Sequence, residues 1–326
     1  RAVVQHPPMR TTHTLGLDVG GTKLEAVVLE LPSGRELARR RVATDRHDGY
    51  DAVVARTVDL ARDTAALAGI PLTDLAVGAG MPGSITAHGL VKNSNTVCLN
   101  GRPFRRDVER ALAAPVAWDN DANTFALAEA LLGAGAPYSA GVVFGVILGT
   151  GVGGGIVIDG RVWRGPQGIA GEWGHHAVWA GAADARPCYC GQRGCVEAYA
   201  SGPAVEAEYV RRGGEPSSLA AIVARREHDA AAAAAVQTLL ETFGRAVANV
   251  IDVLDPSAVV LGGGVSHVAA LYTEGRAAVA ARVFNDELTT PILPNLLGDS
   301  AGVLGAALLA APREALPRAL AARALG

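Results

Sequence analysis

Three short stretches combine glycine with hydroxyl or charged side chains, a composition suited to binding phosphate. They are DVGGTK at residues 18–23, LGTGVGGG at 148–155 and LGGGVS at 261–266. Glycine leaves backbone N–H groups uncovered, so an anion can approach them closely. Any single stretch could equally be a tight turn between strands. The presence of three such glycine stretches in one chain favours a nucleotide bound between two domains. Asp18 is then expected to orient Mg²⁺ through water. The residues expected to bind the nucleotide are Asp18, Gly20, Gly21, Thr22, Lys23, Gly149, Thr150, Gly151, Gly262, Gly263 and Gly264.

A second group of polar residues, WDNDAN at 118–123, follows an apolar run and precedes a helical pattern. Asp121 or Asn120 could simply cap the helix, because both residue types are common at helix N-termini. Alternatively, Asp121 could act as a general base that takes the proton from an attacking hydroxyl. The sequence alone leaves both functions open.

The cysteines indicate a metal site. Cys188, Cys190 and Cys195 form a C-x-C-x4-C pattern, and His175 lies upstream of them. Three thiolates and one imidazole are a donor set typical of closed, structural zinc sites. A disulfide is the alternative, but C-x-C spacing closes poorly and three cysteines leave one unpaired. The fourth cysteine, Cys98, stands alone, so the cysteines do not form the framework of a secreted protein.

Composition excludes several classes of function. The chain has 326 residues, 49% of them hydrophobic, and a net charge of −3, which gives no electrostatic case for nucleic acid or an anionic membrane. The uncharged stretch 141–158 contains seven glycines and is interpreted as two strands around a turn rather than a membrane helix. No apolar signal segment is visible, and a cytoplasmic protein is expected.

Strand and helix patterns alternate, which predicts an α/β fold. LGLDVGGTKLEAVVLE (15–30) and FGVILGTGVGGGIVIDG (144–160) share one form, strand, glycine turn and strand, which indicates two related domains facing one cleft.

Neither G-x-G-x-x-G match, GAGMPG at 78–83 or GTGVGG at 149–154, precedes a helix, which argues against a dinucleotide site. Further predicted elements are strands near 39–44, 75–83, 116–120 and 259–262, helices over 50–68 and 121–133, one long helical zone over 203–253, and a C-terminal helix.

In order along the chain, DVGGTK, GMPG, NDAN, LGTGVGGG, GEWGH, CYCGQRGC and LDPSAVVLGGG resemble the ROK family of sugar kinases and repressors, over about residues 13–310. The resemblance implies an actin-like, hexokinase-type fold with two α/β domains closing on a sugar and ATP. It implies a smaller domain of residues 13–125 with about 303–326, and a larger one of 126–302 with a zinc loop at 171–199. Residues 1–12 are expected to form an N-terminal extension.

The resemblance also assigns roles to residues. Asp121 becomes the catalytic base, and His175 binds zinc through one ring nitrogen and sugar through the other. The zinc ligands are His175, Cys188, Cys190 and Cys195, and a homodimer is expected. Sugar contacts are implied for Gly80, Asn95, Asn120, Asp121, Glu172, His175 and Glu197.

The expected reaction is ATP- and Mg²⁺-dependent phosphorylation of the 6-hydroxyl of a hexose. The stretch GMPGSITAHGLVKNSNTVCLNGRPF most resembles bacterial fructokinases, also called manno(fructo)kinases, so fructose or mannose is the first expectation, with glucose as a further option. Kinases of N-acetylglucosamine or N-acetylmannosamine are the alternative. Cys98 stands where the fructokinase-like pattern has tryptophan, a departure that bears on sugar preference.

ROK repressors carry an N-terminal helix-turn-helix, for which the first phosphate turn at residue 18 leaves no room. A non-catalytic sugar sensor, an ATPase without a sugar and a chaperone-type ATPase are remoter alternatives.

Overall fold

The computed structural model describes residues 13–317 except 87, 95, 180 and 182–184. Its chain divides into two compact units. Within the described part, unit 1 comprises residues 13–124 and 300–317, and unit 2 comprises 125–299. Each unit has its own sheet and its own hydrophobic core.

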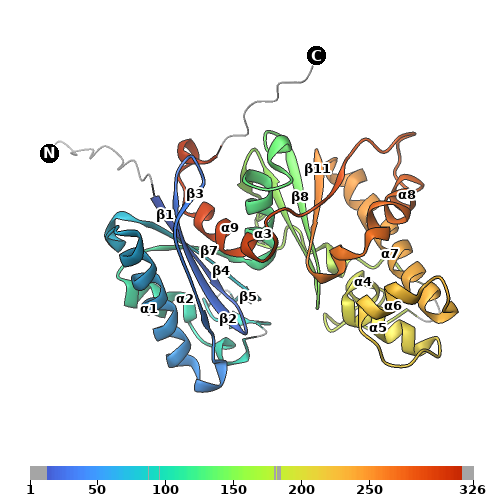
Figure 1. Cartoon of the computed structure of the whole chain (residues 1–326), viewed down its shortest axis with the longest axis horizontal. Helices are drawn as coiled ribbons and strands as arrows, with labels where there is room; N and C mark the ends of the chain where they lie inside the picture. The colour runs from blue at the N-terminus through green and yellow to red at the C-terminus, as the bar shows by residue number, and fades with distance from the viewer. Residues whose placement is uncertain (1–12, 87, 95, 180, 182–184, 318–326) are drawn as a thin grey trace, which may run out of the picture. The chain divides into compact units, whose positions relative to one another are not determined.

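Unit 1 contains a five-stranded sheet in the order β3-β2-β1-β4-β7 (Figure 1). Strands β1, β2 and β3 are antiparallel, whereas β4 and β7 run parallel to β1. A separate small hairpin pairs β5 with β6. The elements are β1 (His13–Val19), β2 (Lys23–Glu30), β3 (Arg35–Ala43), α1 (Tyr50–Ala68), β4 (Ala76–Met81), β5 (Ser84–Ile85), β6 (Val91–Lys92), α2 (Phe104–Leu112), β7 (Val116–Asn120) and α9 (Ala301–Leu309).

Unit 2 repeats this arrangement with a sheet in the order β10-β9-β8-β11-β12. The hairpin β8–β9 corresponds to β1–β2, and the parallel strands β11 and β12 correspond to β4 and β7, so the repeat predicted from the two similar sequences is confirmed. The elements are β8 (Val142–Leu148), β9 (Val152–Ile158), β10 (Arg161–Val162), α4 (Glu197–Ala200), α5 (Gly202–Arg211), α6 (Leu219–Arg225), α7 (Ala230–Leu254), β11 (Ala258–Gly262), α8 (Glu274–Ala280) and β12 (Ile292–Pro294), with α3 (Asp121–Leu131) starting in unit 1.

Corresponding glycines let one helix lie directly on each sheet. A Cβ atom at Gly16 or Gly78 would come within 2.3 or 1.9 Å of carbonyl oxygens of α9. In unit 2, a Cβ atom at Gly145 or Gly262 would come within 2.5 or 2.4 Å of side chains of α3. Gly16 and Gly145 occupy the same position in the repeated sequence, so the repeat includes the residue that allows the close helix–sheet approach.

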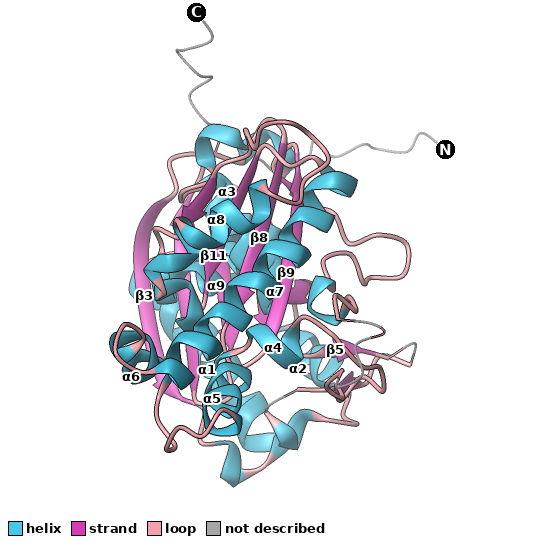
Figure 2. Cartoon of the chain, turned by 90° about the vertical axis from the view of Figure 1, so that its right-hand side faces the viewer, coloured by secondary structure: helices cyan, strands magenta, loops and turns pink. Residues whose placement is uncertain are grey.

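The opposite faces of the sheets carry the larger cores. In unit 1, Leu15 and Leu17 alternate with Gly16 along β1 and are buried with residues of α1 and α2. In unit 2, Phe144 and Val146 of β8 belong to a core with many residues of α7, which lies across the sheet in Figure 2. Among the described residues, no helix combines the length and the hydrophobicity that crossing a bilayer requires.

Helix boundaries follow local signals in most places. The helix predicted at 50–68 is confirmed, and Gly69 ends it in the left-handed conformation, with φ of 69°. The single helical zone predicted over 203–253 is wrong in detail, because the structure has α5, α6 and α7 there. Side chains of Ser201, Ser218 and Asp229 cap the starts of these three helices. Serine and aspartate are typical N-cap residues, so these three positions could have indicated in the sequence where each new helix begins.

Candidate functional site

Parallel strands of unit 1 place several predicted site residues at one edge of its sheet. Asp18 of β1 lies opposite Gly80 of β4, and Gly80 lies opposite Asp119 of β7. Asn120 ends β7 and Asp121 begins α3, so both follow directly at the same edge. Carboxyl ends of parallel strands are a common location of ligand sites in open α/β sheets.

At the junction between β7 and α3, one residue caps the helix and a different residue is the candidate base. Oδ1 of Asn120 accepts a hydrogen bond from the backbone N–H of Asn123 (2.8 Å), and Asp119 Oδ1 accepts one from Asn123 Nδ2 (2.7 Å). Asn120 therefore caps the helix. Asp121 is exposed, and its Oδ1 also accepts from the N–H of Ala122 (2.9 Å). An exposed carboxylate in the first helical turn is sterically available to a substrate hydroxyl, as a general base requires.

Asp18 lies in a strongly perturbed environment. Burial and then the negative charge of Asp121 together raise the pKa of its carboxyl to about 6, against the opposing effect of Lys23. The start of α9 contributes to the crowding, because a Cβ atom at Gly302 would lie 3.1 Å from Oδ2 of Asp18. Two neighbouring carboxylates favour a bound cation, and oxygen donors are the ligands that Mg²⁺ prefers. Asp18 and Asp121 thus fit a Mg²⁺–phosphate site in chemistry.

Asp18 should consequently lower the stability of the folded chain at neutral pH. Its folded pKa lies above the value of about 3.9 expected in the unfolded chain, so its contribution to stability falls as pH rises from about 4 to about 6. We expect Asp18→Asn to raise the free energy of unfolding by about 2–3 kcal/mol at pH 7, and by much less at pH 4. Urea unfolding without Mg²⁺ at both pH values measures this difference. The exposed Asp74→Asn variant is the control, and equal stability of Asp18→Asn and the native chain at pH 7 would contradict the argument.

The turn between β1 and β2 is held by contacts that sequence reasoning missed. The N–H of Gly20 donates to the carbonyl of Lys23 (3.0 Å). Thr44, which follows β3, donates its hydroxyl to the carbonyl of Gly20 (2.7 Å) and its N–H to that of Thr22 (3.0 Å). Thr44 thus fixes the predicted phosphate turn from a distant segment, and no local signal marks it.

Lys23 is positioned by a buried acid. Its Nζ lies 3.5 Å from a carboxylate oxygen of Glu25, whose side chain is fully buried. Arg39 and Arg41 of β3 pair with the same carboxylate at 2.8 and 2.9 Å. Arg39 also pairs with Glu36 at 2.6 Å. Lys23 is the cation of this cluster that lies at the turn itself, where its charge suits an anionic ligand.

Unit 2 carries the other two glycine turns at neighbouring strand ends. The N–H of Gly149 donates to the carbonyl of Gly151 (2.9 Å), which closes the turn between β8 and β9 around Thr150. Gly262 pairs with Ile147 in the sheet, so the turn Gly262–Gly264 begins beside the end of β8. At Gly263, φ is 81° and a Cβ atom would lie 2.4 Å from the carbonyl of Leu148, so this position requires glycine.

The GEWGH segment lies directly on β9. Trp173 is buried and donates its ring N–H to the carbonyl of Gly153 (2.8 Å). A Cβ atom at Gly174 would lie 2.1 Å from the carbonyl of Val152, so only glycine allows this contact. This packing fixes Glu172 and His175 on either side of the buried tryptophan.

Glu197, predicted to contact sugar, adjoins the second of the turns predicted to bind phosphate. Its Oε2 accepts a hydrogen bond from the N–H of Val152 (2.9 Å) and faces the α-carbon of Gly151, where a Cβ atom would lie 2.8 Å away. The start of α5 also reaches the turn, because the N–H of Gly202 donates to the carbonyl of Gly149 (2.8 Å). In unit 2, hydrogen bonds therefore connect Glu197, predicted to bind sugar, and the start of α5 directly to the turn Gly149–Gly151, predicted to bind phosphate.

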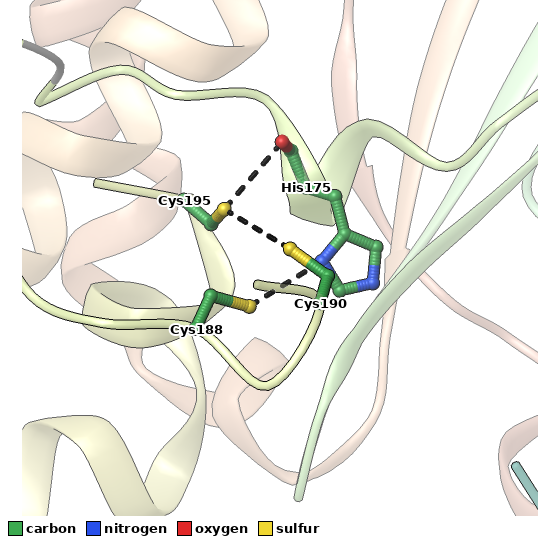
Figure 3. Close-up of side chains that lie close together, drawn as sticks. All are labelled: His175, Cys188, Cys190 and Cys195. Carbon is green, nitrogen blue, oxygen red and sulfur yellow. Dashed lines mark hydrogen bonds between the residues drawn. The ribbon is translucent and has the colours of Figure 1, made fainter. Parts of the chain in front are cut away.

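The predicted zinc ligands converge (Figure 3). One ligand atom each from His175, Cys188, Cys190 and Cys195 lies within 4.8 Å of all the others. Nδ1 of His175 is 3.6 Å from Sγ of Cys188, and the Sγ atoms of Cys190 and Cys195 are 3.7 Å apart. A tetrahedral zinc site requires separations of about 3.6 Å between nitrogen and sulfur and about 3.8 Å between sulfurs.

These distances fit zinc and not a disulfide. All four cysteines are free, and 3.7 Å is far longer than the S–S bond of about 2.05 Å. Burial, together with the neighbouring thiols Cys190 and Cys188, raises the pKa of Cys195 to about 12, so thiolates would need a cation to form here. The four residues would hold zinc in a closed site with no open position, which makes the metal structural.

Aromatic and ionic contacts anchor the zinc loop to helices of unit 2. Arg186 pairs with the buried Glu208 of α5, and its guanidinium lies 4.2 Å from the centre of the Tyr199 ring. Trp179 donates its ring N–H to Thr242 of α7 (2.9 Å). These contacts anchor the segment between His175 and Cys188 to α5 and α7.

The structure thus groups the predicted residues within each unit. Unit 1 brings Asp18, Gly80, Asn120 and Asp121 to one sheet edge. Unit 2 places Glu197 at the turn Gly149–Gly151 and gathers the four zinc ligands. Asn95, predicted to contact sugar, lies outside the described residues. The roles of these residues in binding and catalysis remain predictions.

Comparisons with known proteins agree with this architecture. The model of the ROK family matches residues 14–313. The N-acetylgalactosamine kinase AgaK of Shewanella sp. strain ANA-3 is 36% identical over 90% of this chain and 95% of its own length. The N-acetyl-D-glucosamine kinase of Photobacterium profundum is 38% identical over 90% of this chain and 98% of its own length. The crystal structure of a ROK hexokinase from Thermus thermophilus superposes with a TM-score of 0.81, at 32% identity, over 91% of this chain and 97% of that one. The chain therefore belongs to the ROK family and has its actin-like ATPase fold.

Proposed function

We propose that this protein is an ATP- and Mg²⁺-dependent kinase that phosphorylates the 6-hydroxyl of an N-acetylhexosamine. The observation that supports a kinase best is the exposed carboxylate of Asp121 at the sheet edge that also carries Asp18. The preference for an acetamido sugar rests on the relatives that act on N-acetylgalactosamine and N-acetylglucosamine. These relatives favour this alternative over fructose or mannose, which the GMPG segment suggested.

In the proposed mechanism, Asp121 accepts the proton of the sugar 6-hydroxyl as this hydroxyl attacks the terminal phosphoryl group of ATP. Backbone N–H groups of the three glycine turns bind the phosphates, and Lys23 adds positive charge beside the first turn. Asp18 would hold Mg²⁺ through water, and the metal would supply positive charge to neutralise the phosphates. Glu172, His175 and Glu197 hold sugar hydroxyls, and Asn120 combines helix capping with a sugar contact. His175 and the three cysteines would hold a structural zinc.

A sugar panel tests the proposal. ADP release is coupled to an optical assay with N-acetylglucosamine, N-acetylgalactosamine, N-acetylmannosamine, fructose, mannose and glucose as substrates. We expect kcat/KM for at least one acetamido sugar to exceed that for fructose and mannose by tenfold or more, with phosphate on the 6-hydroxyl of the product. ATP without sugar gives the background.

Two outcomes would contradict different parts of the proposal. Faster turnover of fructose or mannose than of every acetamido sugar would refute the sugar class and leave a kinase. ADP release that no sugar stimulates would refute the kinase itself. A stoichiometry of one ADP per sugar phosphate excludes uncoupled hydrolysis.

A further inference from the structure

Tyr189, between two of the cysteines, contacts the outer side of the candidate zinc ligand His175. Its hydroxyl lies 3.2 Å from Nε2 of His175, and the two rings meet edge to face with centroids 5.3 Å apart. Nδ1, the other ring nitrogen, faces Cys188. The tyrosine therefore contacts the nitrogen that would remain available once Nδ1 holds a metal.

The state of the histidine fixes the direction of this hydrogen bond. An imidazole that ligates a metal through Nδ1 carries its hydrogen on Nε2 and donates it. The phenol oxygen of Tyr189 can share this hydrogen with a sugar hydroxyl at Nε2, and the hydrogen of the phenol is then directed to another acceptor. Tyr189 therefore lies beside the nitrogen of His175 that is predicted to contact sugar.

The surroundings of Tyr189 are polar and acidic. The carboxylates of Glu197 and Glu172 place negative charge near its phenol. A tyrosine hydroxyl can donate one hydrogen bond as well as accept. His175, Glu172 and Glu197 are the residues of unit 2 already predicted to bind sugar, so Tyr189 lies among them.

Tyr189 as a whole residue is 75% exposed. An exposed ring contributes little to the core, so Tyr189 is not needed to stabilise the fold. Tyrosine combines a flat apolar face with a polar end, and a pyranose offers both C–H faces and hydroxyls. The side chain of Tyr189 is therefore chemically complementary to a pyranose.

On the basis of the kinase function proposed above, we propose that Tyr189 is a further sugar-binding residue. Its hydroxyl, which lies beside Nε2 of His175, donates to a hydroxyl of the bound sugar, while its exposed side chain packs against the sugar C–H face. The residue thereby extends the sugar site beyond the residues that motif comparison identifies.

Tyr189→Phe removes the hydroxyl and keeps the ring. We expect the KM for sugar to rise about 3- to 10-fold, the size of one lost hydrogen bond, with kcat and the KM for ATP changed less than twofold. Tyr189→Ala also removes the ring and should raise the sugar KM further. Tyr50→Phe, which removes a hydroxyl bonded to Asp107 in unit 1, is the matched control and should leave the sugar KM unchanged.

Calorimetric sugar binding and zinc content of each variant separate the possible causes. Weaker sugar binding by Tyr189→Phe at unchanged zinc content supports the proposal. Unchanged sugar affinity overturns it, and so does loss of zinc, because Tyr189 would then support the metal site only. Sugar binding without sugar-stimulated ADP release would refute the kinase function and still test Tyr189, whereas a native chain that binds no sugar would overturn both.

Discussion

Replacing Asp121 with asparagine should lower kcat by about 10²- to 10⁴-fold, because a general base supplies rate enhancement of that order. The amide cannot accept the proton of the sugar hydroxyl, but its oxygen can still accept the hydrogen bond from the N–H of Ala122. The KM for sugar should change little by comparison. Steady-state kinetics with the best sugar of the panel measures both constants.

This loss should occur without unfolding. Asp121 is exposed, and its charge raises the pKa of Asp18, so the substitution removes a repulsion between two acids. The urea midpoint of Asp121→Asn should therefore equal or exceed that of the native chain. Asp286→Asn, an exposed change in unit 2, is the kinetic control. Turnover by Asp121→Asn within tenfold of native would exclude Asp121 as the base.

Removal of one zinc ligand should have the largest effect on stability. Cys195 is fully buried and its Sγ lies 3.7 Å from that of Cys190, so Cys195→Ser eliminates a central donor of the cluster. We expect bound zinc to fall from one per chain to less than about 0.1, and the free energy of unfolding to fall by about 4 kcal/mol or more. Metal analysis and urea unfolding measure the two quantities.

A matched cysteine provides the control for the zinc experiment. Cys98 is a free cysteine in unit 1, so Cys98→Ser makes the same chemical change outside the cluster and should keep full zinc content. A strong chelator should lower the melting temperature of the native chain to that of Cys195→Ser and leave the variant unaffected. The metal site would be refuted if the purified native protein contained no zinc. It would also be refuted if the chelator left the melting temperature of zinc-loaded native protein unchanged.

Local sequence was sufficient for much of this molecule. The hairpin at 13–30, the helix ending at Gly69 and the turn from β7 into α3 follow from residue periodicity and from glycine and N-cap residues, which act over a few neighbouring positions. The ligand type and close spacing of the three cysteines indicated their cluster with His175. Ordered motifs identified the family over most of the chain.

The sequence was less informative about sugar class. The segment after β4 suggested fructose or mannose, whereas two of the related proteins are named as kinases of N-acetylgalactosamine and N-acetyl-D-glucosamine. Specificity depends on the shape of a pocket assembled from several segments, and a change of one contact shifts it without altering the motifs. A single motif therefore could not decide it.

Only the tertiary structure determined which distant residues modify the site. Thr44 holds the turn between β1 and β2 that is predicted to bind phosphate, burial and Asp121 together raise the pKa of Asp18, and Tyr189 contacts Nε2 of His175. None of these contacts leaves a pattern in sequence, because each joins residues brought together by strand pairing or loop packing. Electrostatic and hydrogen-bond energies depend on distance and burial, and both are properties of the folded chain.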